Sequence, residues 1–195
     1  MMLVAATRRL AIAAALILFL AAAPRLFAQA GEDVLSQKEI ETLRDAAYIP
    51  ADRLIAYEKI LNTREKEIED LMSKPHRPGF NQDMHDLLDQ FGAIADEFND
   101  NLDEYSSKHR DVRKALPKLI EATERWSTTL RAPADDDTYK VVRRIALDSV
   151  KDMHDIATNM QTEQAAYFKA HPDAVKLEKE RADENHAPVE QPTPR

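Results

Sequence analysis

The residues with the clearest capacity for chemistry belong to a tetrapeptide, Asp-Met-His-Asp, that occurs twice, at residues 83–86 and 152–155. Methionine sulfur and imidazole nitrogen both ligate copper and haem iron, and facing helices of a bundle can hold such a site between them. The repeat therefore defines a candidate metal or haem site, composed of Met84, His85, Met153 and His154.

Other patterns that mark an active site are missing from the sequence. Cysteine is absent, so neither a thiolate metal site nor a thiol nucleophile can form. No histidine before residue 172 has a carboxylate three residues ahead of it, the spacing of carboxylate-bridged di-iron bundles. The sequence also lacks a phosphate-binding glycine loop, a paired-histidine zinc motif and a serine nucleophile elbow. These observations predict no cofactor and favour a non-enzymatic protein.

The N-terminus has the three-part layout of a secretory signal peptide. Arg8 and Arg9 precede an apolar run over residues 10–23, and small residues surround a cleavage point after Ala30. The run is shorter than the roughly twenty residues that a membrane-spanning helix needs, which favours cleavage over retention as an anchor. We therefore expect residues 1–30 to be a signal peptide. The mature chain is then periplasmic or secreted and has no transmembrane segment.

The charge balance narrows the range of partners. The chain carries 35 acidic and 27 basic residues, a formal net charge of −8, and removal of residues 1–30 takes away three arginines and no acid, which gives −11. Nucleic acids and anionic membranes bind proteins largely through lysine and arginine, so we expect neither as a partner. The sequence favours a protein partner or self-association, including a homodimer.

Composition and periodicity favour an all-α fold. Only three glycines occur, whereas an all-β domain of this length needs many for its turns, and apolar residues recur at three- and four-residue spacing. We expect an elongated antiparallel helical bundle of three to five helices with coiled-coil-like packing, within a domain over residues 31–171. Residues 172–195 are charged and proline-rich, which predicts a disordered tail.

Two helices separated by a proline are expected at the start of this domain. Ser36 and Glu39 have the spacing of a capping box, which predicts a helix over residues 36–47. Pro50 suits the first turn of a second helix over residues 50–73. If the second helix continues the direction of the first, one buried stripe joins them, formed by Ile40, Ala47, Leu54, Leu61 and Ile68.

A seven-residue repeat runs through the middle of the chain, at Met84, Phe91, Phe98, Tyr105, Val112, Leu119 and Trp126. Such spacing predicts helices that pack side by side along a dry, aromatic seam. The polar stretch at residues 106–111 and Pro117 leave two alternatives, either one helix over residues 81–131 or two that meet near the polar stretch. A single long helix would leave apolar surface uncovered and would favour a dimer.

The last helix bears on the candidate metal site. Its seven-residue series contains Tyr139, Ala146, Met153, Met160 and Tyr167. The two series place both motif methionines on buried stripes and put each neighbouring histidine one position off the stripe, facing solvent. This periodicity favours two core methionines with exposed histidines over a shared metal site. Gly92, in the middle of a helix, can let another helix approach closely.

These observations together favour an exported, non-enzymatic helical interaction protein of the cell envelope, such as a scaffold, an adaptor or a chaperone-like protein. One alternative is a periplasmic metal- or haem-binding bundle that uses the methionines and histidines of the repeated tetrapeptide. A further alternative is an enzyme with an active site that no sequence motif marks.

Overall fold

The computed structural model of the chain describes residues 34–186. The expected signal peptide over residues 1–30 lies outside the described residues, as do residues 187–195 of the expected tail. The described part consists of helices and connecting loops and contains no β-strand, so the predicted all-α fold is confirmed. Within it, no helix has the length and apolarity required to cross a membrane.

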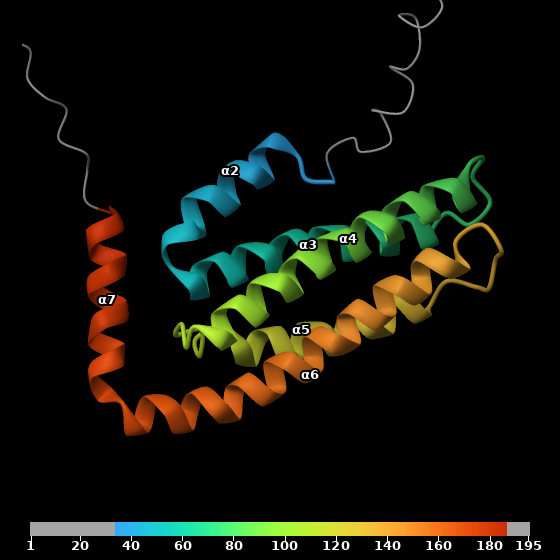
Figure 1. Cartoon of the computed structure of the whole chain (residues 1–195). Helices are drawn as coiled ribbons and strands as arrows, with labels where there is room; N and C mark the ends of the chain where they lie inside the picture. Colours follow the sequence, from blue (N-terminus) through green and yellow to red (C-terminus); the bar gives the residue numbers. More distant parts are fainter. Residues whose placement is uncertain (1–33, 187–195) are drawn as a thin grey trace, which may run out of the picture. The chain divides into compact units, whose positions relative to one another are not determined.

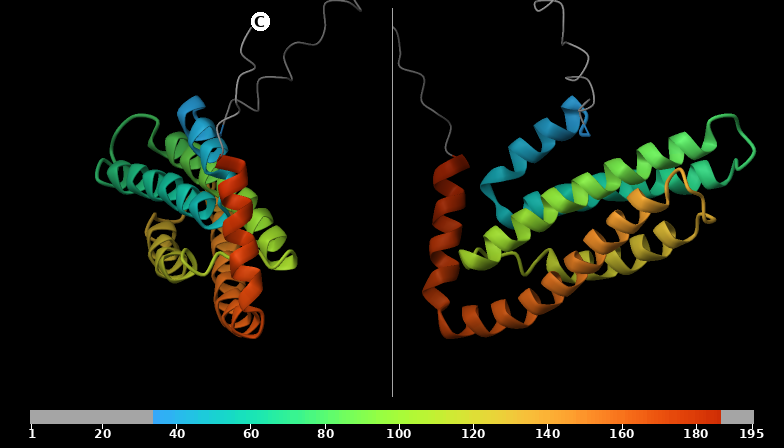
Figure 2. Two further views of the ribbon diagram at one scale, coloured as in Figure 1. Left: turned by 90° about the vertical axis from the view of Figure 1, so that its left-hand side faces the viewer. Right: turned by 45° about the vertical axis from the view of Figure 1, so that its right-hand side comes forward.

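Six α-helices and one 3-10 helix follow one another in residues 34–186. They are α2 (Gln37–Asp45), η1 (Ala46–Tyr48), α3 (Pro50–Met72), α4 (Phe80–Ser107), α5 (Leu116–Arg131), α6 (Lys140–Ala170) and α7 (Pro172–His186). The four helices α3 to α6 lie side by side, whereas α2 and α7 lie outside them (Figures 1 and 2). The bundle of the described residues is therefore built from α3, α4, α5 and α6.

Consecutive helices of the bundle run in opposite directions, as expected, but the most extensive contact joins two parallel helices, α4 and α6 (Figure 1). Three hydrogen bonds fix their register: Asn81 to Asp136, Asn99 to the Ser149 carbonyl, and Gln164 to the Arg110 carbonyl. The partners are 55, 50 and 54 residues apart in the sequence. Because this separation stays nearly constant along the pair, the two helices run in the same direction. The hairpins α3–α4 and α5–α6 thus pack with α4 against α6.

The bundle core contains the whole middle seven-residue series, because all seven residues from Met84 to Trp126 are buried. The Trp126 ring meets Phe91 edge to face, with centroids 5.8 Å apart, and its indole N–H donates to Asn62 on α3 at 2.9 Å. An edge-to-face pair of this kind adds about 0.5–1.5 kcal/mol beyond burial. The predicted aromatic seam is therefore the centre of the packing.

The middle segment forms two helices rather than one. α4 ends in a Schellman motif, in which the Arg110 N–H donates to the Tyr105 carbonyl at 2.9 Å and the His109 N–H to the Ser106 carbonyl at 3.1 Å. His109 has a φ of 49°, in the left-handed region. Pro117 then lies in the first turn of α5. The seven-residue repeat continues across the break because both helices turn the same face toward one core.

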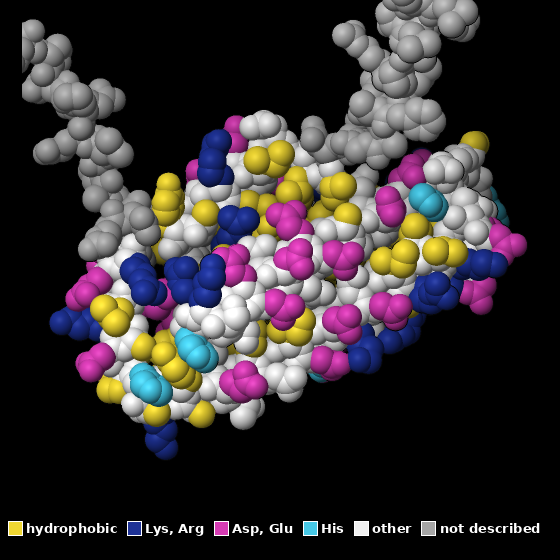
Figure 3. All heavy atoms as spheres, in the orientation of Figure 1, with side chains coloured by type: hydrophobic (Ala, Val, Ile, Leu, Met, Phe, Trp, Pro, Cys, Tyr) yellow, Lys and Arg dark blue, Asp and Glu magenta, His cyan; other side chains and the backbone are white. Residues whose placement is uncertain are grey.

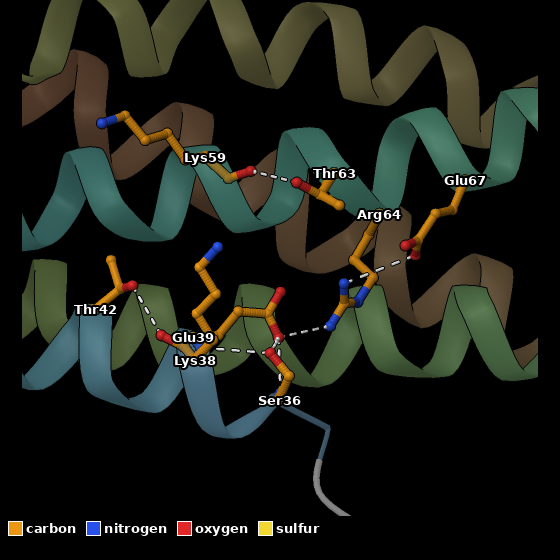
Figure 4. Close-up of polar contacts among 8 residues, drawn as sticks. All are labelled: Ser36, Lys38, Glu39, Thr42, Lys59, Thr63, Arg64 and Glu67. Carbon is orange, nitrogen blue, oxygen red and sulfur yellow. Dashed lines mark hydrogen bonds and ion pairs between the residues drawn. The ribbon is translucent and has the colours of Figure 1, made fainter.

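α2 folds back onto α3, so the expected continuous stripe is wrong at its first two residues. Ile40 is 39% exposed and Ala47 is exposed, whereas Leu54, Leu61 and Ile68 are buried. The predicted capping box is present, and Glu39, which belongs to it, also accepts a hydrogen bond from Arg64 of α3 at 3.0 Å (Figure 4). This ion pair fixes the direction of α2.

α7 corrects the prediction of a disordered tail for residues 172–186, which are helical. Pro172 occupies the first helical position, where its missing N–H has no helical partner to lose, and Ala, Lys, Leu and Glu follow it. The Arg110 side chain also pairs with Glu178 of α7. Composition predicted disorder here because the segment has few apolar residues, and in the structure α7 accordingly buries little apolar surface of its own.

α4 and α6 pack closely at Gly92. A Cβ atom added to Gly92 would lie 3.6 Å from the Cα atom of Ala146, which is ordinary van der Waals contact. Ala146 is itself fully buried. The pair of small residues therefore allows the two backbones to pack closely, with room for one methyl group between them.

This geometry predicts opposite effects for two substitutions at Gly92. Gly92→Ala should raise the free energy of unfolding by about 1 kcal/mol, because alanine has the higher helix propensity. Gly92→Leu should lower it by about 1–3 kcal/mol, because the larger side chain forces α4 away from α6. Urea denaturation followed by circular dichroism measures both. Destabilisation by alanine comparable to that by leucine would contradict the described spacing.

Glu39 makes the attachment of α2 dependent on pH. Burial raises the pKa of Glu39, but hydrogen bonds from Ser36 and Arg64 outweigh burial and hold the pKa below its ordinary value. A lowered pKa means that the carboxylate stabilises the fold above the unfolded-state value of about 4.3, and that this stabilisation is lost as pH falls through the folded pKa. Acidification should therefore release α2.

In the unmodified chain, we expect the amide protection factors of α2 to decrease once the pH is lowered beneath about 4, near the ordinary pKa of glutamate. Glu39→Gln should show the same loss already at neutral pH. Glu41→Gln, at an exposed position of α2, is the matched control and should retain protection. Hydrogen exchange measures all three. Unchanged protection in Glu39→Gln would show that the ion pair does not hold α2.

Candidate functional site

The structure separates the methionines of the repeated tetrapeptide from the histidines. Met84 and Met153 are fully buried in the bundle core. His85 and His154 are half-buried. Nδ1 of His85 lies 3.0 Å from Asp86, and Nδ1 of His154 lies 2.9 Å from the Thr123 hydroxyl of α5. Each imidazole thus has a local partner, and neither points into the core with its neighbouring methionine.

The two copies of the tetrapeptide also lie at different levels of the bundle. Asn99 of α4 is level with Ser149 of α6, one turn before Met153. Met84 precedes Asn99 by a distance of about 22 Å along α4, at 1.5 Å per residue. In residues 34–186, no three histidine or carboxylate side chains are grouped in a way that could hold a metal ion. The predicted ligands therefore do not converge on one site.

Buried polar residues elsewhere in the bundle join helices to one another. The Tyr57 hydroxyl of α3 donates to Glu97 of α4 at 2.5 Å, and burial together with this hydrogen bond raises the pKa of Tyr57 to about 12. Glu65 of α3 accepts from Arg125 at 3.0 Å and from the Thr129 hydroxyl at 3.1 Å, both on α5. These contacts hold α3 against its two neighbours.

A groove of about 550 Å³ opens at the end of the bundle where α3 begins. We call it the terminal groove. Three separate segments line it: Ile49, Pro50 and Ala51 before and within α3; Asp111, Arg113 and Lys114 of the α4–α5 connection; and Val175, Glu178 and Lys179 of α7. Figure 2 shows α7 running across this end of the bundle. The groove combines an apolar lining with charged groups and contains neither a histidine nor a hydroxyl side chain.

Gln164 of α6 fixes the wall formed by the α4–α5 connection. Its amide donates to the Arg110 carbonyl at 2.8 Å and accepts from the Val112 N–H at 3.2 Å, and its side chain is buried. A buried glutamine that satisfies two backbone groups outside any helix acts as an internal cap for the loop. The wall therefore has a defined position although residues 110–112 carry no secondary structure.

Aromatic stacking fastens the same loop to the last turns of α6. The imidazole of His109 stacks on Tyr167, with centroids 4.1 Å apart, and His171 stacks on Tyr167 at 4.4 Å. The Arg113 guanidinium lies over Phe168 at 4.4 Å from the ring centroid. A cation over an aromatic face contributes about 0.5–1 kcal/mol at an exposed site. α6 thus supplies a rigid support for the groove.

The charged groups of the terminal groove differ in how they are paired. Arg113 donates to both oxygens of Asp111, at 2.9 and 2.7 Å. Burial raises the pKa of Asp111, but the hydrogen bonds from Arg113 outweigh it and hold the pKa below its ordinary value. Glu178 pairs with Arg110. Lys114 is 75% exposed and reaches Asp52 only at 3.4 Å, and Lys179 is also exposed, so the two lysines form a basic rim.

The sequence carried one overlooked signal for this site. The buried three- and four-residue pattern of α6 contains two polar residues, Ser149 and Gln164, and Gln164 is the larger of them. The other buried residues of α6 are Ala146, Val150, Met153, Ala157, Met160 and Phe168. A polar residue on an apolar stripe indicates a backbone group that needs a partner. The groove itself has no comparable signal, because its lining comes from segments far apart in the chain.

Comparison of the chain with known protein families, with curated proteins and with solved structures finds no match. Functional conclusions for this chain therefore depend on its own residues and their geometry.

Gln164→Leu tests whether the wall of the terminal groove depends on Gln164. The substitution keeps much of the volume but leaves the Arg110 carbonyl and the Val112 N–H without partners, at a cost of about 1–3 kcal/mol for each group that stays buried. We expect lower stability in urea and at least a tenfold loss of protection at the Val112 amide, which corresponds to about 1.4 kcal/mol.

Gln161→Leu, at an exposed position one turn earlier in α6, is the matched control and should change neither quantity. If Gln164→Leu leaves the Val112 amide as protected as in the unmodified chain, the loop is held by other contacts.

Proposed function

We propose that the chain is an exported, non-enzymatic interaction protein of the cell envelope that binds a protein partner through the terminal groove. The observation that carries the proposal is the groove itself, in which an apolar lining lies open between a fixed wall and α7. Grooves of this composition suit a protruding apolar side chain of a partner, with polar groups setting its orientation.

The placement of the remaining polar residues supports a binding role over a catalytic one. The buried carboxylate of Glu65 and the buried phenol of Tyr57 are each engaged in contacts between helices. The methionines of the tetrapeptide fill the core, and each histidine beside them contacts one side chain, Asp86 or Thr123, at the edge of the bundle. The chemistry-bearing residues singled out in the sequence therefore serve the scaffold, whereas the terminal groove presents an unfilled surface.

The charges of the groove specify the kind of partner. Arg113 and Glu178 are already paired with Asp111 and Arg110, which leaves the rim lysines, Lys114 and Lys179, as its most available charges. A complementary segment carries an apolar side chain flanked by carboxylates. Electrostatic complementarity of this kind increases association rates and selects among partners. The expected secretory signal supplies the location, because it directs the chain to the cell envelope.

Site-directed crosslinking tests this proposal. Because the chain has no cysteine, Val175→Cys places a single photoreactive maleimide crosslinker beside the groove. We expect one defined protein adduct in cell-envelope fractions. The same crosslinker on Gln161→Cys, at an exposed position of α6, should give no such adduct.

Charge reversal distinguishes specific binding at the terminal groove from non-specific crosslinking. In the Val175→Cys background, Lys114→Glu with Lys179→Glu should reduce the adduct yield, because both rim charges then repel an acidic partner. Lys59→Glu with Lys66→Glu, at exposed positions of α3, is the control with the same net charge and should leave the yield unchanged. Equal adducts at Val175 and Gln161, or no adduct at either position, would overturn the proposal.

A further inference from the structure

A second groove, with a volume of about 320 Å³, lies between α5 and α6. We call it the lateral groove. Its lining consists of Thr123, Glu124, Ser127 and Arg131 of α5 and Val150, Lys151 and His154 of α6. The volume is at the lower end of the range for sites that bind small ligands. None of these residues lines the terminal groove, so the lateral groove is a separate surface.

A buried hydroxyl fixes the hydrogen-bonding pattern of His154 at one end of the lateral groove. Thr123 is 1% exposed, and its hydroxyl donates to the Ile120 carbonyl at 2.7 Å. Because a hydroxyl has only one proton, it accepts at its second contact, where Nδ1 of His154 lies 2.9 Å away. The neutral imidazole therefore carries its free lone pair on Nε2, which has no hydrogen-bond partner in residues 34–186. His154 thus offers a hydrogen-bond acceptor to a ligand.

The same contact sets the register of α5 and α6, which run in opposite directions (Figure 1). Ser127 comes four residues after Thr123 in α5. Val150 comes four residues before His154 in α6, so Ser127 and Val150 lie level with each other. Val150 is 1% exposed and supplies an apolar floor in the middle of the groove. The groove therefore continues from His154 toward the end of α5.

The end of the groove beside His154 carries negative charge. Glu124, next to Thr123, is exposed, and its carboxylate has no hydrogen bond or ion pair with the described part of the chain. Lys151 pairs with Asp155 at 2.6 Å, so these two neighbouring charges offset each other. The carboxylate of Glu124 and Nε2 of His154 are both acceptors, and together they suit a donor group with positive charge.

The opposite end of the groove carries positive charge. Arg131 comes seven residues after Glu124 on the same face of α5, is exposed, and has no ion pair with a described residue. Arg144, in the second turn of α6, adds another exposed cation at this end. Asp148, one turn after Arg144, is exposed but does not line the groove. Figure 3 shows lysine and arginine side chains along the edge of the molecule where α6 begins. This end suits a carboxylate.

The separation of the two ends indicates the size of the ligand. Seven residues of helix advance about 10 Å, at 1.5 Å per residue, so Glu124 and Arg131 are about this far apart along α5. An extended peptide advances about 3.3–3.6 Å per residue, and three residues therefore span about 10–11 Å. Such a peptide carries an ammonium group at its first residue and a carboxylate at its last. Its termini match the two ends of the groove in sign and in spacing.

We propose that the lateral groove binds short peptides of about three residues through their free termini. The N-terminal ammonium donates to the carboxylate of Glu124 and to Nε2 of His154, and the C-terminal carboxylate accepts from Arg131. The Ser127 hydroxyl, which has no hydrogen-bond partner in residues 34–186, contacts the peptide backbone between them. Recognition through the termini requires no particular side chains in the peptide. This ligand is distinct from the protein partner proposed for the terminal groove.

Titration of the isotope-labelled chain with trialanine, followed by NMR, tests the site. We expect saturable chemical-shift changes at the amides of residues 123–131 and 150–154, which contain the groove lining. N-acetyl-trialanine and trialanine amide each lack one charged terminus. Each should bind at least about tenfold more weakly, because a hydrogen bond to a charged group contributes at least that factor. Free alanine should also bind weakly, since it is too short to reach both ends.

Two substitutions assign each terminus of the peptide to its end of the groove. Glu124→Gln should weaken the binding of trialanine about tenfold or more but leave that of N-acetyl-trialanine unchanged, because the acetylated peptide has no ammonium group. Arg131→Gln should weaken trialanine similarly but leave trialanine amide unchanged. Glu163→Gln of α6 and Arg44→Gln of α2 remove the same charges at exposed positions and are the matched controls. Circular dichroism confirms that all four variants remain helical.

Shifts that do not saturate, or that lie outside the lateral groove, would overturn the proposal. Equal affinity for trialanine and its two blocked forms would also overturn it, because the termini would then play no part in binding. The crosslinked adduct of Val175→Cys should persist when Arg131→Gln is added. The terminal groove and the lateral groove therefore succeed or fail separately.

Discussion

The close packing of α4 against α6 is the contact on which the other features of the bundle depend. Gly92 and Ala146 let the two backbones approach, and the hydrogen bonds of Asn99 and Ser149 fix their register. With that register set, the C-terminal half of α6 carries Gln164, which holds the wall of the terminal groove. The α4–α6 pair thus positions the candidate site.

The sequence predicted which residues are buried better than it predicted how the helices are arranged. Seven-residue spacing identified the core from Met84 to Trp126, and local chemistry identified the capping box at Ser36 and the helix start at Pro50. Periodicity defines the face of a helix but neither its direction nor its neighbour. It therefore missed the return of α2 onto α3 and the parallel pairing of α4 with α6. The helicity of α7 was missed because α7 buries little apolar surface of its own, and because its ion pair joins Glu178 to a residue 68 positions away, which local patterns do not reveal.

The candidate sites illustrate the same limit. Spacing correctly placed the methionines of the repeated tetrapeptide in the core, because a position on the buried stripe depends only on helix geometry. The histidines beside them are half-buried rather than solvent-facing, because neighbouring side chains cover part of each ring. The terminal groove could not be predicted, since its lining joins residues 49–51, 111–114 and 175–179 through tertiary packing. Gln164 was the accessible clue, as a large polar residue on a mostly apolar stripe. Such residues identify loops that the core must hold in place.

The central claim, that this chain acts by presenting surfaces to other proteins, is tested most directly by cysteine reactivity inside the cell envelope. The chain has no native cysteine, so a membrane-impermeant maleimide reports on one engineered thiol at a time. The account predicts that a thiol at Val175 reacts more slowly in intact cells than in the purified chain, whereas a thiol at Gln161 reacts at the same rate in both. Equal rates at Val175 in cells and in the purified chain would contradict the claim.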